Sequence, residues 1–329
     1  MRTDGRLGGS PRPGVADTPS LGIAMTDHPL IDPNDRVLGA ALRTGPLAFG
    51  CWRFTHTDTA HARKVLDAAL DAGMNLVDTA DVYGLDWGGT GFGTVEQLLG
   101  DVLRQSPGVR NRIVLATKGG IIPPVPYNSG PAALRAACEA SLERLGVDHI
   151  DLYQVHRPDV FAHPDDVADT LAALRAEGKV GEVGISNHTP AQHDTLAAAL
   201  AERGVQIATT QVEYSAAHLD PLRDGTFDVA MRRRTAVMVW SPLAGGRLVT
   251  GHGVSPDLLD TLDDIAATHR TDRTTVALAF TLAHPCRPVV VVGSQDPGRL
   301  AAAAAAVHVP LDRTDAYRIV AAAQGEPLP

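Results

Sequence analysis

Short apolar runs alternate with longer stretches of helical period from Arg36 to the end of the chain. A short apolar run bounded by turn residues is typical of a buried strand, and a 3.6-residue period indicates an amphipathic helix. The runs predict strands at Leu47–Cys51, Asn75–Asp78, Ile113–Thr117, Ile150–Val155, Val180–Ser186, Ile207–Val212, Ala236–Trp240 and Val289–Val292. Helices are predicted between them, the first over Thr59–Ala72 and others beginning at Thr94, Pro131, Pro164, Pro190 and Ser255.

Eight strands with interleaved helices predict an α/β fold, a (β/α)8 TIM barrel formed by residues 35–329 as a single domain. A doubly wound open sheet would need fewer strands and a glycine fingerprint directly after its first strand. The glycines of Gly88–Gly93 lie instead in a long loop with no strand directly before it, and we interpret them as part of a flexible lid.

Residues 1–34 are rich in Gly, Pro, Ser and Asp and lack an apolar stretch long enough for a secretory signal or a membrane span. This composition predicts a disordered N-terminal extension, because such a segment buries too little apolar surface to fold.

The composition, 44% hydrophobic and 20% charged, is typical of a soluble globular protein. The net charge of −9 disfavours nucleic acid and anionic membranes as partners. Cys51, Cys138 and Cys286 are too widely spaced for a disulfide framework or a zinc cluster, so we expect no metal and a cytoplasmic location.

Reactive side chains stand at the carboxyl ends of successive predicted strands, where barrels of this kind carry their chemistry. Asp78 ends the second strand, Tyr83 follows it, and Lys118 and His156 follow the third and fourth. Each residue alone has a structural interpretation, as a helix cap, a packed aromatic, a salt-bridged lysine or a core histidine. Their convergence favours a site in which Lys118 either forms a Schiff base or lowers the pKa of the Tyr83 phenol.

The motifs DTADVYG (Asp78–Gly84), TKGG, VHRPD, GISNH, QVEYS, WSPLAGGRL and VVGS, in this order, resemble the aldo-keto reductase superfamily. Within it the chain is most similar to bacterial NADP-dependent oxidoreductases, and the resemblance extends from about Leu38 to Ala323. It implies a barrel whose base is closed by a short N-terminal hairpin, which we expect over Val37–Leu42 and Thr44–Phe49 around Arg43.

The resemblance also assigns a catalytic tetrad of Asp78, Tyr83, Lys118 and His156. In carbonyl reduction Tyr83 would donate the proton, Lys118 would lower the pKa of its phenol, and Asp78 would hold the lysine. His156 would donate a hydrogen bond to the substrate carbonyl.

Family members bind a nicotinamide dinucleotide, which would supply the hydride. By resemblance, Ser186, Asn187 and Gln211 would bind its carboxamide and Trp240 would stack under its ring. The resemblance assigns the rest of the cofactor site to Gly50, Cys51, Trp52, Ser241, Leu243, Gly245, Arg247, Gly293, Ser294, Gln295 and Arg299. Arg299 favours NADP(H), whereas Gln295, standing where many relatives have a basic residue, keeps NAD(H) open.

Aromatic residues in the predicted mouth loops suggest a broad apolar substrate cleft, which suits an aldehyde or ketone of moderate size. The expected substrate residues are Trp52, Trp87, Tyr127 and Arg157, and the expected lids are Leu85–Gly93 and Ile121–Gly130. The sequence thus favours an NADPH-dependent carbonyl reductase. An NAD-dependent dehydrogenase of a sugar or alcohol, a nicotinamide-binding redox sensor and, more remotely, a Schiff-base lyase remain alternatives.

Overall fold

The apolar runs of the chain form the strands of a closed parallel barrel in the computed structural model, which describes residues 29–55 and 58–326. The barrel strands are β3 (Leu47–Gly50), β4 (Leu76–Asp78), β5 (Val114–Gly119), β6 (Ile150–Val155), β7 (Val180–Ser186), β8 (Ile207–Glu213), β9 (Ala236–Trp240) and β10 (Val289–Val292). They pair in chain order, and β10 closes the barrel by pairing with β3. The predicted (β/α)8 fold is confirmed.

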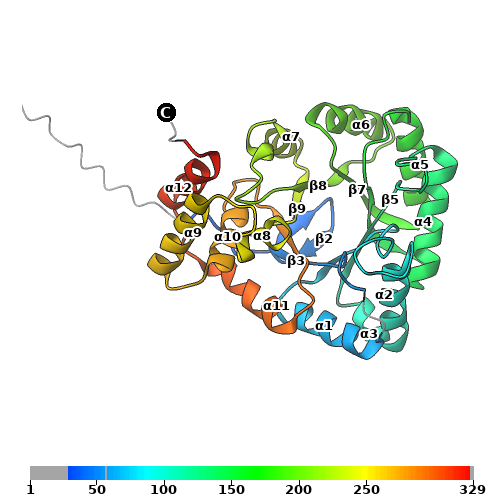
Figure 1. Ribbon diagram of the computed structural model, residues 1–329. Coiled ribbons are helices and arrows are strands. Elements are labelled where there is room, and N and C mark those ends of the chain that lie inside the picture. Colours follow the sequence, from blue (N-terminus) through cyan, green and yellow to red (C-terminus); the bar gives the residue numbers. More distant parts are fainter. Residues whose placement is uncertain (1–28, 56–57, 327–329) are drawn as a thin grey trace, which may run out of the picture.

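Helices surround this barrel (Figure 1). The α-helices are α1 (Thr59–Asp71), α2 (Thr94–Gln105), α3 (Pro107–Arg110), α4 (Pro131–Leu145), α5 (Pro164–Ala176), α6 (Pro190–Glu202), α7 (Thr226–Arg233), α8 (Arg247–Thr250), α9 (Pro256–His269), α10 (Arg273–Leu282), α11 (Pro297–Ala303) and α12 (Arg313–Gln324). Short 3-10 helices are η1 (Asp220–Leu222), η2 (Ala244–Gly246) and η3 (Ala304–His308). Several α-helices begin with proline, whose missing N–H needs no partner in the first turn.

Side chains of the strands alternate between the barrel interior and the helix layer, as the period of two requires. Leu76 packs in the interior cluster with Ala116 and Leu152, whereas its neighbour Val77 packs in the outer core beneath the helices. Toward the carboxyl ends of β4, β5 and β6 the inward positions become polar. This alternation gathers the reactive side chains at one end of the barrel.

The base of the barrel is covered by an antiparallel hairpin of β1 (Arg36–Leu38) and β2 (Leu42–Thr44). The hairpin is where we expected one, but the predicted turn around Arg43 is wrong, because the chain reverses at residues 39–41 instead. Gly39 adopts φ +59°, which glycine tolerates at low cost, and Ala40 N–H donates to Glu182 Oε1 at 2.9 Å. The expected second arm is also wrong beyond Thr44, since Leu47–Gly50 forms barrel strand β3.

Most of the expected N-terminal extension lies outside the described residues, so its disorder stays a prediction. Its last few residues lie against the barrel: Leu30 N–H donates to Leu311 O at 2.9 Å, and Ile31 is buried in the outer core. Contacts with the barrel therefore begin before residue 35. Across residues 29–55 and 58–326, no helix combines the length and apolarity needed to cross a membrane.

Candidate active site

Lys118 lies fully buried at the mouth end of the barrel interior, within β5 and one residue before its end. Its ammonium donates to Asp78 Oδ2 at 2.6 Å, to Thr79 O at 2.8 Å and to Tyr83 Oη at 3.3 Å. Burial lowers the pKa of Lys118, but Asp78 and Tyr83 outweigh burial and raise it above its ordinary value. Lys118 is therefore a charged, fully coordinated ammonium, a poor nucleophile for Schiff-base formation.

The Tyr83 hydroxyl is one of the acceptors of this ammonium, and its ring lies edge-on to His156 with 5.9 Å between the ring centroids. Burial raises the pKa of Tyr83, and Lys118 lowers it only in part, so the net shift is upward. Lys118 thus acts on the pKa in the expected direction, but in the protein alone desolvation of the phenolate exceeds the attraction of the ammonium. Tyr83 is thus a protonated phenol at neutral pH and can give a proton.

His156 follows β6 and is 8% exposed beside Tyr83. Burial and then the positive charges of Lys118 and Arg157 hold the pKa of His156 well below its ordinary value. The ring is therefore neutral near pH 7 and carries one N–H donor. Its Nδ1 atom is without a hydrogen-bond partner among the residues the structure describes.

A second polar group adjoins His156 and links three of the expected cofactor residues. Asn187 Nδ2 donates to Ser186 Oγ at 2.8 Å and to His156 O at 3.3 Å, while Asn187 Oδ1 accepts from Trp240 Nε1 at 3.0 Å. Asn187 does not cap the following helix, since Thr189 caps α6 through a capping box. The structure thus brings Ser186, Asn187 and Trp240 together next to the tetrad.

Gln211, the fourth residue expected at the carboxamide, reaches the tetrad directly. Its Nε2 donates to Asp78 Oδ1 at 3.0 Å, so this carboxylate binds Gln211 through one oxygen and Lys118 through the other. Gln211 is 2% exposed on β8. Gln211 therefore joins the tetrad to the polar group of Ser186, Asn187 and Trp240.

The loop after β9 contains several residues with left-handed backbone conformation. Gly245 and Gly246 both have positive φ, at +70° and +99°, and Ser241 has φ +56°. Successive turns of this kind can direct backbone N–H groups toward a phosphate. Arg53 Nη2 donates to Gly245 O at 3.1 Å, which ties this loop to the loop after β3. Arg247 begins α8 with its side chain exposed, and the Leu243 side chain packs against the core.

The loop after β10 carries the residues expected on the adenosine side of a cofactor. Gln295 Nε2 donates to Gly293 O at 3.3 Å and to Gly50 O at 3.4 Å, and Arg299 is exposed on α11. Ser294 Oγ accepts from Asp296 N–H at 3.3 Å.

Two expected cofactor residues have packing roles. The Cys51 side chain is fully buried and packs in the outer core, and Asp78 and Lys118 lie near enough to influence the pKa of its thiol. A Cβ on Gly50 would fall 2.7 Å from Val291 Cγ1, which gives this glycine a packing reason as well.

Trp52 and Trp87 form an exposed aromatic pair at the mouth, with ring centroids 5.0 Å apart. The Arg53 guanidinium lies 4.6 Å from the Trp87 ring centroid. Arg157 lies 5.9 Å from the Trp240 ring centroid, next to the group expected to bind the cofactor. Tyr127 is exposed on the loop after β5, and within the described parts of the chain no contact joins it to the tetrad.

Sequence reasoning missed Gln154, whose Nε2 donates to Asp78 Oδ1 at 3.2 Å. It also missed Arg53, which bridges two mouth loops. A signal for Gln154 was present, because it stands two residues before His156 and a strand places such positions on one face.

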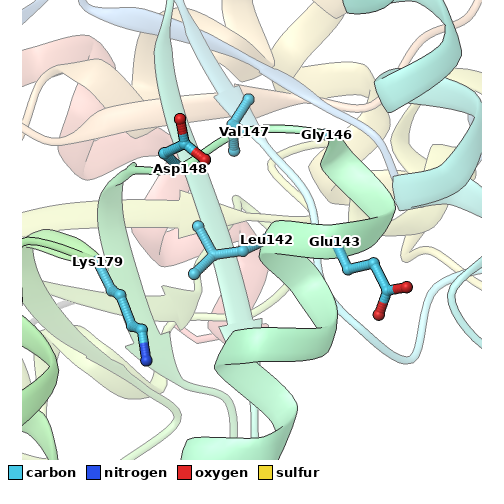
Figure 2. A pocket seen from close by; sticks show the side chains of 6 residues that line it. All are labelled: Leu142, Glu143, Gly146, Val147, Asp148 and Lys179. Carbon is cyan, nitrogen blue, oxygen red and sulfur yellow. The ribbon is translucent and has the colours of Figure 1, made fainter.

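A surface hollow of about 390 Å³ lies at the other end of the barrel (Figure 2). It is lined by Leu142, Glu143, Gly146, Val147, Asp148 and Lys179. Asp148 and Lys179 stand just before β6 and β7, whereas the tetrad residues stand at the carboxyl ends of their strands. This hollow is therefore remote from the candidate active site.

The chain is similar to known proteins over most of its length. The aldo/keto reductase family model matches residues 46–324. A 6-dehydroglucose reductase of Novosphingobium aromaticivorans is 44% identical over 309 residues, covering 93% of this chain and 100% of the relative. A 6-dehydroglucose reductase of Agrobacterium fabrum is 33% identical over 301 residues, covering 88% and 97%.

Among solved structures, a thermostable aldo-keto reductase in complex with the inhibitor epalrestat superposes with a TM-score of 0.74 at 22% identity. The match covers 88% of this chain and 99% of that protein, and it supports the fold. Because the family model spans most of the sequence and the relatives match nearly end to end, this chain is an oxidoreductase that belongs to the aldo/keto reductase family.

Proposed function

We propose that the protein reduces the carbonyl group of an aldehyde or ketone with NADPH, and that Tyr83 gives the proton. The observation that carries this proposal is the hydrogen-bonded chain from Asp78 through the Lys118 ammonium to the Tyr83 hydroxyl, with neutral His156 beside it. Carbonyl reduction develops negative charge on oxygen, so it needs a proton donor and fixed positive charge at that oxygen. This group supplies both.

The division of roles follows from the protonation states. Tyr83 keeps its proton at neutral pH because burial raises the pKa of its phenol, which suits donation to an oxyanion. The adjacent Lys118 ammonium stabilises the phenolate that donation leaves behind, and Asp78 holds the ammonium in place. His156 donates its N–H to the carbonyl and fixes the direction of approach. A bound nicotinamide would supply the hydride.

The residues of the mouth fit such a cofactor. Ser186, Asn187 and Trp240 form one hydrogen-bonded group that would bind and pack the nicotinamide end, with Gln211 alongside. The left-handed turn at Gly245 and Gly246 would receive the pyrophosphate. Gln295 Oε1 is buried and has no partner within the described ranges, so it is free to accept from a ligand. Arg299 is exposed on α11, where a guanidinium can bind the 2′-phosphate of NADPH.

For the substrate we propose an oxidised sugar. Two relatives carry the name 6-dehydroglucose reductase. The Trp52–Trp87 pair would offer an exposed aromatic surface on which the apolar face of a sugar ring packs, and Arg53 and Arg157 would provide donors for hydroxyl groups.

The test is steady-state NADPH oxidation with 6-dehydroglucose and, for comparison, benzaldehyde. We expect wild-type turnover with both and a higher kcat/KM for the sugar. Tyr83→Phe should lower kcat by about 100- to 10,000-fold, the range for loss of a general acid. Its affinity for NADPH, followed by quenching of tryptophan fluorescence, should stay within about twofold, since the hydroxyl acts on the substrate.

Three outcomes would contradict the proposal. Full activity of Tyr83→Phe would remove Tyr83 from the chemistry. Tight NADPH binding without turnover of any carbonyl would favour a redox-sensing role. Turnover only in the direction of oxidation with NAD would make the protein a dehydrogenase.

A further inference from the structure

The barrel interior directly beneath the tetrad is filled by polar side chains. Gln154 on β6 and Thr209 on β8 are both 0% exposed, and Gln211 is 2% exposed. Deeper inward positions on these and neighbouring strands are apolar, among them Leu152 and Met238. A buried amide or hydroxyl is costly unless its hydrogen bonds are made, so the partners of this polar layer indicate what it does.

The hydrogen bonds of the layer converge on one carboxylate oxygen. Gln154 Nε2 donates to Asp78 Oδ1 at 3.2 Å and Gln211 Nε2 donates to the same atom at 3.0 Å. Thr209 Oγ1 donates to Gln154 Oε1 at 3.3 Å. Because the hydroxyl proton engages the amide oxygen, the NH2 end of Gln154 is the end that faces Asp78.

A glycine on β7, the strand between β6 and β8, makes room for the Gln154–Thr209 pair. Gly184 lies on β7, next to β6 and β8 in the barrel. A Cβ at this position would fall 2.2 Å from Thr209 Oγ1 and 2.9 Å from Gln154 Cγ. Its φ is not positive, so close approach of the pair, and not backbone conformation, accounts for the glycine.

We propose that Gln154, oriented by Thr209 in the space left by Gly184, is a positioning residue that holds the Asp78 carboxylate toward Lys118. Gln154 touches neither Lys118 nor Tyr83 through any hydrogen bond of the described residues, so it acts through Asp78. If Thr209 lost its hydroxyl, the amide could turn its oxygen toward the carboxylate. The repulsion would shift Asp78 and weaken the support of the ammonium. This inference rests on the proposed reductase chemistry.

The titratable groups that interact with Asp78 are Lys118 on β5, Tyr83 after β4 and Cys51 after β3. Asp81 after β4 and His156 after β6 interact with Lys118. Lys118 is one of only three lysines in the chain, with Lys64 and Lys179. Its side-chain methylene next to the ammonium can therefore be observed by NMR with little overlap.

The experiment compares kcat, KM and nucleotide affinity in four variants. Gln154→Leu removes the donor and should lower kcat by about tenfold, with KM and NADPH affinity within about twofold of wild type. Thr209→Val should lower kcat by about three- to tenfold, and Thr209→Ser, which restores the hydroxyl, should recover most of that loss. The matched control is Thr210→Val on the same strand. The Thr210 hydroxyl has no hydrogen-bond partner in the described chain, so its loss should leave kcat unchanged.

A second readout does not depend on activity. Lysine labelled with ¹³C at Cε, in a Lys64→Arg/Lys179→Arg background, gives one signal that follows the surroundings of Lys118. In Gln154→Leu the chemical shift of this signal at neutral pH should differ from that of wild type, because the Asp78 carboxylate that holds the ammonium has lost an N–H donor. A wild-type protein that reduces no carbonyl would refute the proposed function while this signal still tests the positioning role.

The positioning role would be overturned by a Gln154→Leu variant with wild-type kcat and an unmoved Lys118 signal. Equal kcat for Thr209→Val and Thr209→Ser would also overturn it, since the hydroxyl would then be irrelevant. If Gln154→Leu fails to fold, the positioning role is tested by the kcat values of Thr209→Val and Thr209→Ser and by the Lys118 signal in Thr209→Val.

Discussion

Tyr83 and His156 are both neutral for the same physical reason. Each is placed where burial disfavours its charged form, and burial is the largest cause of the pKa shift in both. The direction of the shift differs, since the charged form is an anion for the phenol and a cation for the imidazole. Under the proposed function, these protonation states would let the pair donate hydrogen bonds and a proton to a carbonyl oxygen near neutral pH.

These shifts predict a flat pH dependence for reduction. The pKa of His156 is lowered, so the ring stays neutral above its ordinary value of about 6.5, and the pKa of Tyr83 is raised, so the phenol stays protonated up to about 10. We expect kcat/KM for carbonyl reduction to vary little between these limits. The measurement is kcat/KM at saturating NADPH across that range. A descending limb centred near pH 7 or 8 would mean that Tyr83 titrates far lower than its surroundings imply.

We expect the choice between NADPH and NADH to depend on Arg299. Arg299→Ala should weaken NADPH binding by about 10- to 100-fold and leave NADH binding within about twofold, because only NADPH has the 2′-phosphate that a guanidinium can bind. Fluorescence titration with both nucleotides measures this. Arg318→Ala, on α12 beside Asp264, serves as the control for loss of a surface arginine. If Arg299→Ala lost affinity for NADPH and NADH equally, the 2′-phosphate would be bound elsewhere.

At the scale of elements, the mouth consists of loops fastened to one another by a few polar contacts. Arg53 connects the loop after β3 with that after β9. Asp159, in the loop after β6, accepts from Ser129 N–H at 2.8 Å and from Phe161 N–H at 3.0 Å. The expected lid Ile121–Gly130 is therefore anchored at one end by a carboxylate on the next loop. Hydrogen bonds to a carboxylate are the stronger kind, so we expect this anchor to restrict the motion of the segment.

Removing the anchor should loosen the lid without disturbing the cofactor. In Asp159→Ala we expect faster amide hydrogen exchange in residues 121–130 and a KM for the carbonyl substrate raised about three- to tenfold, with NADPH affinity unchanged. Asp169→Ala on α5, which removes an exposed partner of Arg203, is the matched control. Unaltered exchange and KM in Asp159→Ala would show that the lid is held by other contacts.

At the scale of the whole molecule, the alternation of short apolar runs with helical stretches predicted the barrel, and the position of Asp78, Lys118 and His156 at strand ends predicted where they meet. The hairpin turn was misplaced because the apolar run at Leu47–Phe49 reads equally well as a hairpin arm or as a barrel strand, and only barrel closure decides between them. The lowering effect of Lys118 on the pKa of Tyr83 was predicted, but the larger opposing effect of burial was not, since burial of a mouth residue cannot be estimated from sequence. Gln154 was overlooked because its neighbours across the barrel, on β4 and β8, are distant in the chain.

We expect the base of the barrel to contribute to stability and the mouth to activity. A substitution at the base can test whether the two are independent. Leu38 of the hairpin is fully buried in the interior cluster with Ala48, Leu76 and Val289, whereas its neighbour Val37 is 48% exposed. Leu38→Ala should lower the free energy of unfolding by about 2–5 kcal/mol, the usual cost of a cavity left by a buried leucine. Val37→Ala should change it by less than about 0.5 kcal/mol. Urea unfolding measures both, and kcat and KM of folded Leu38→Ala should match wild type because the tetrad lies at the opposite end. A large loss of kcat in the folded variant would show that interior packing transmits strain from the base to the tetrad, which would contradict the separation.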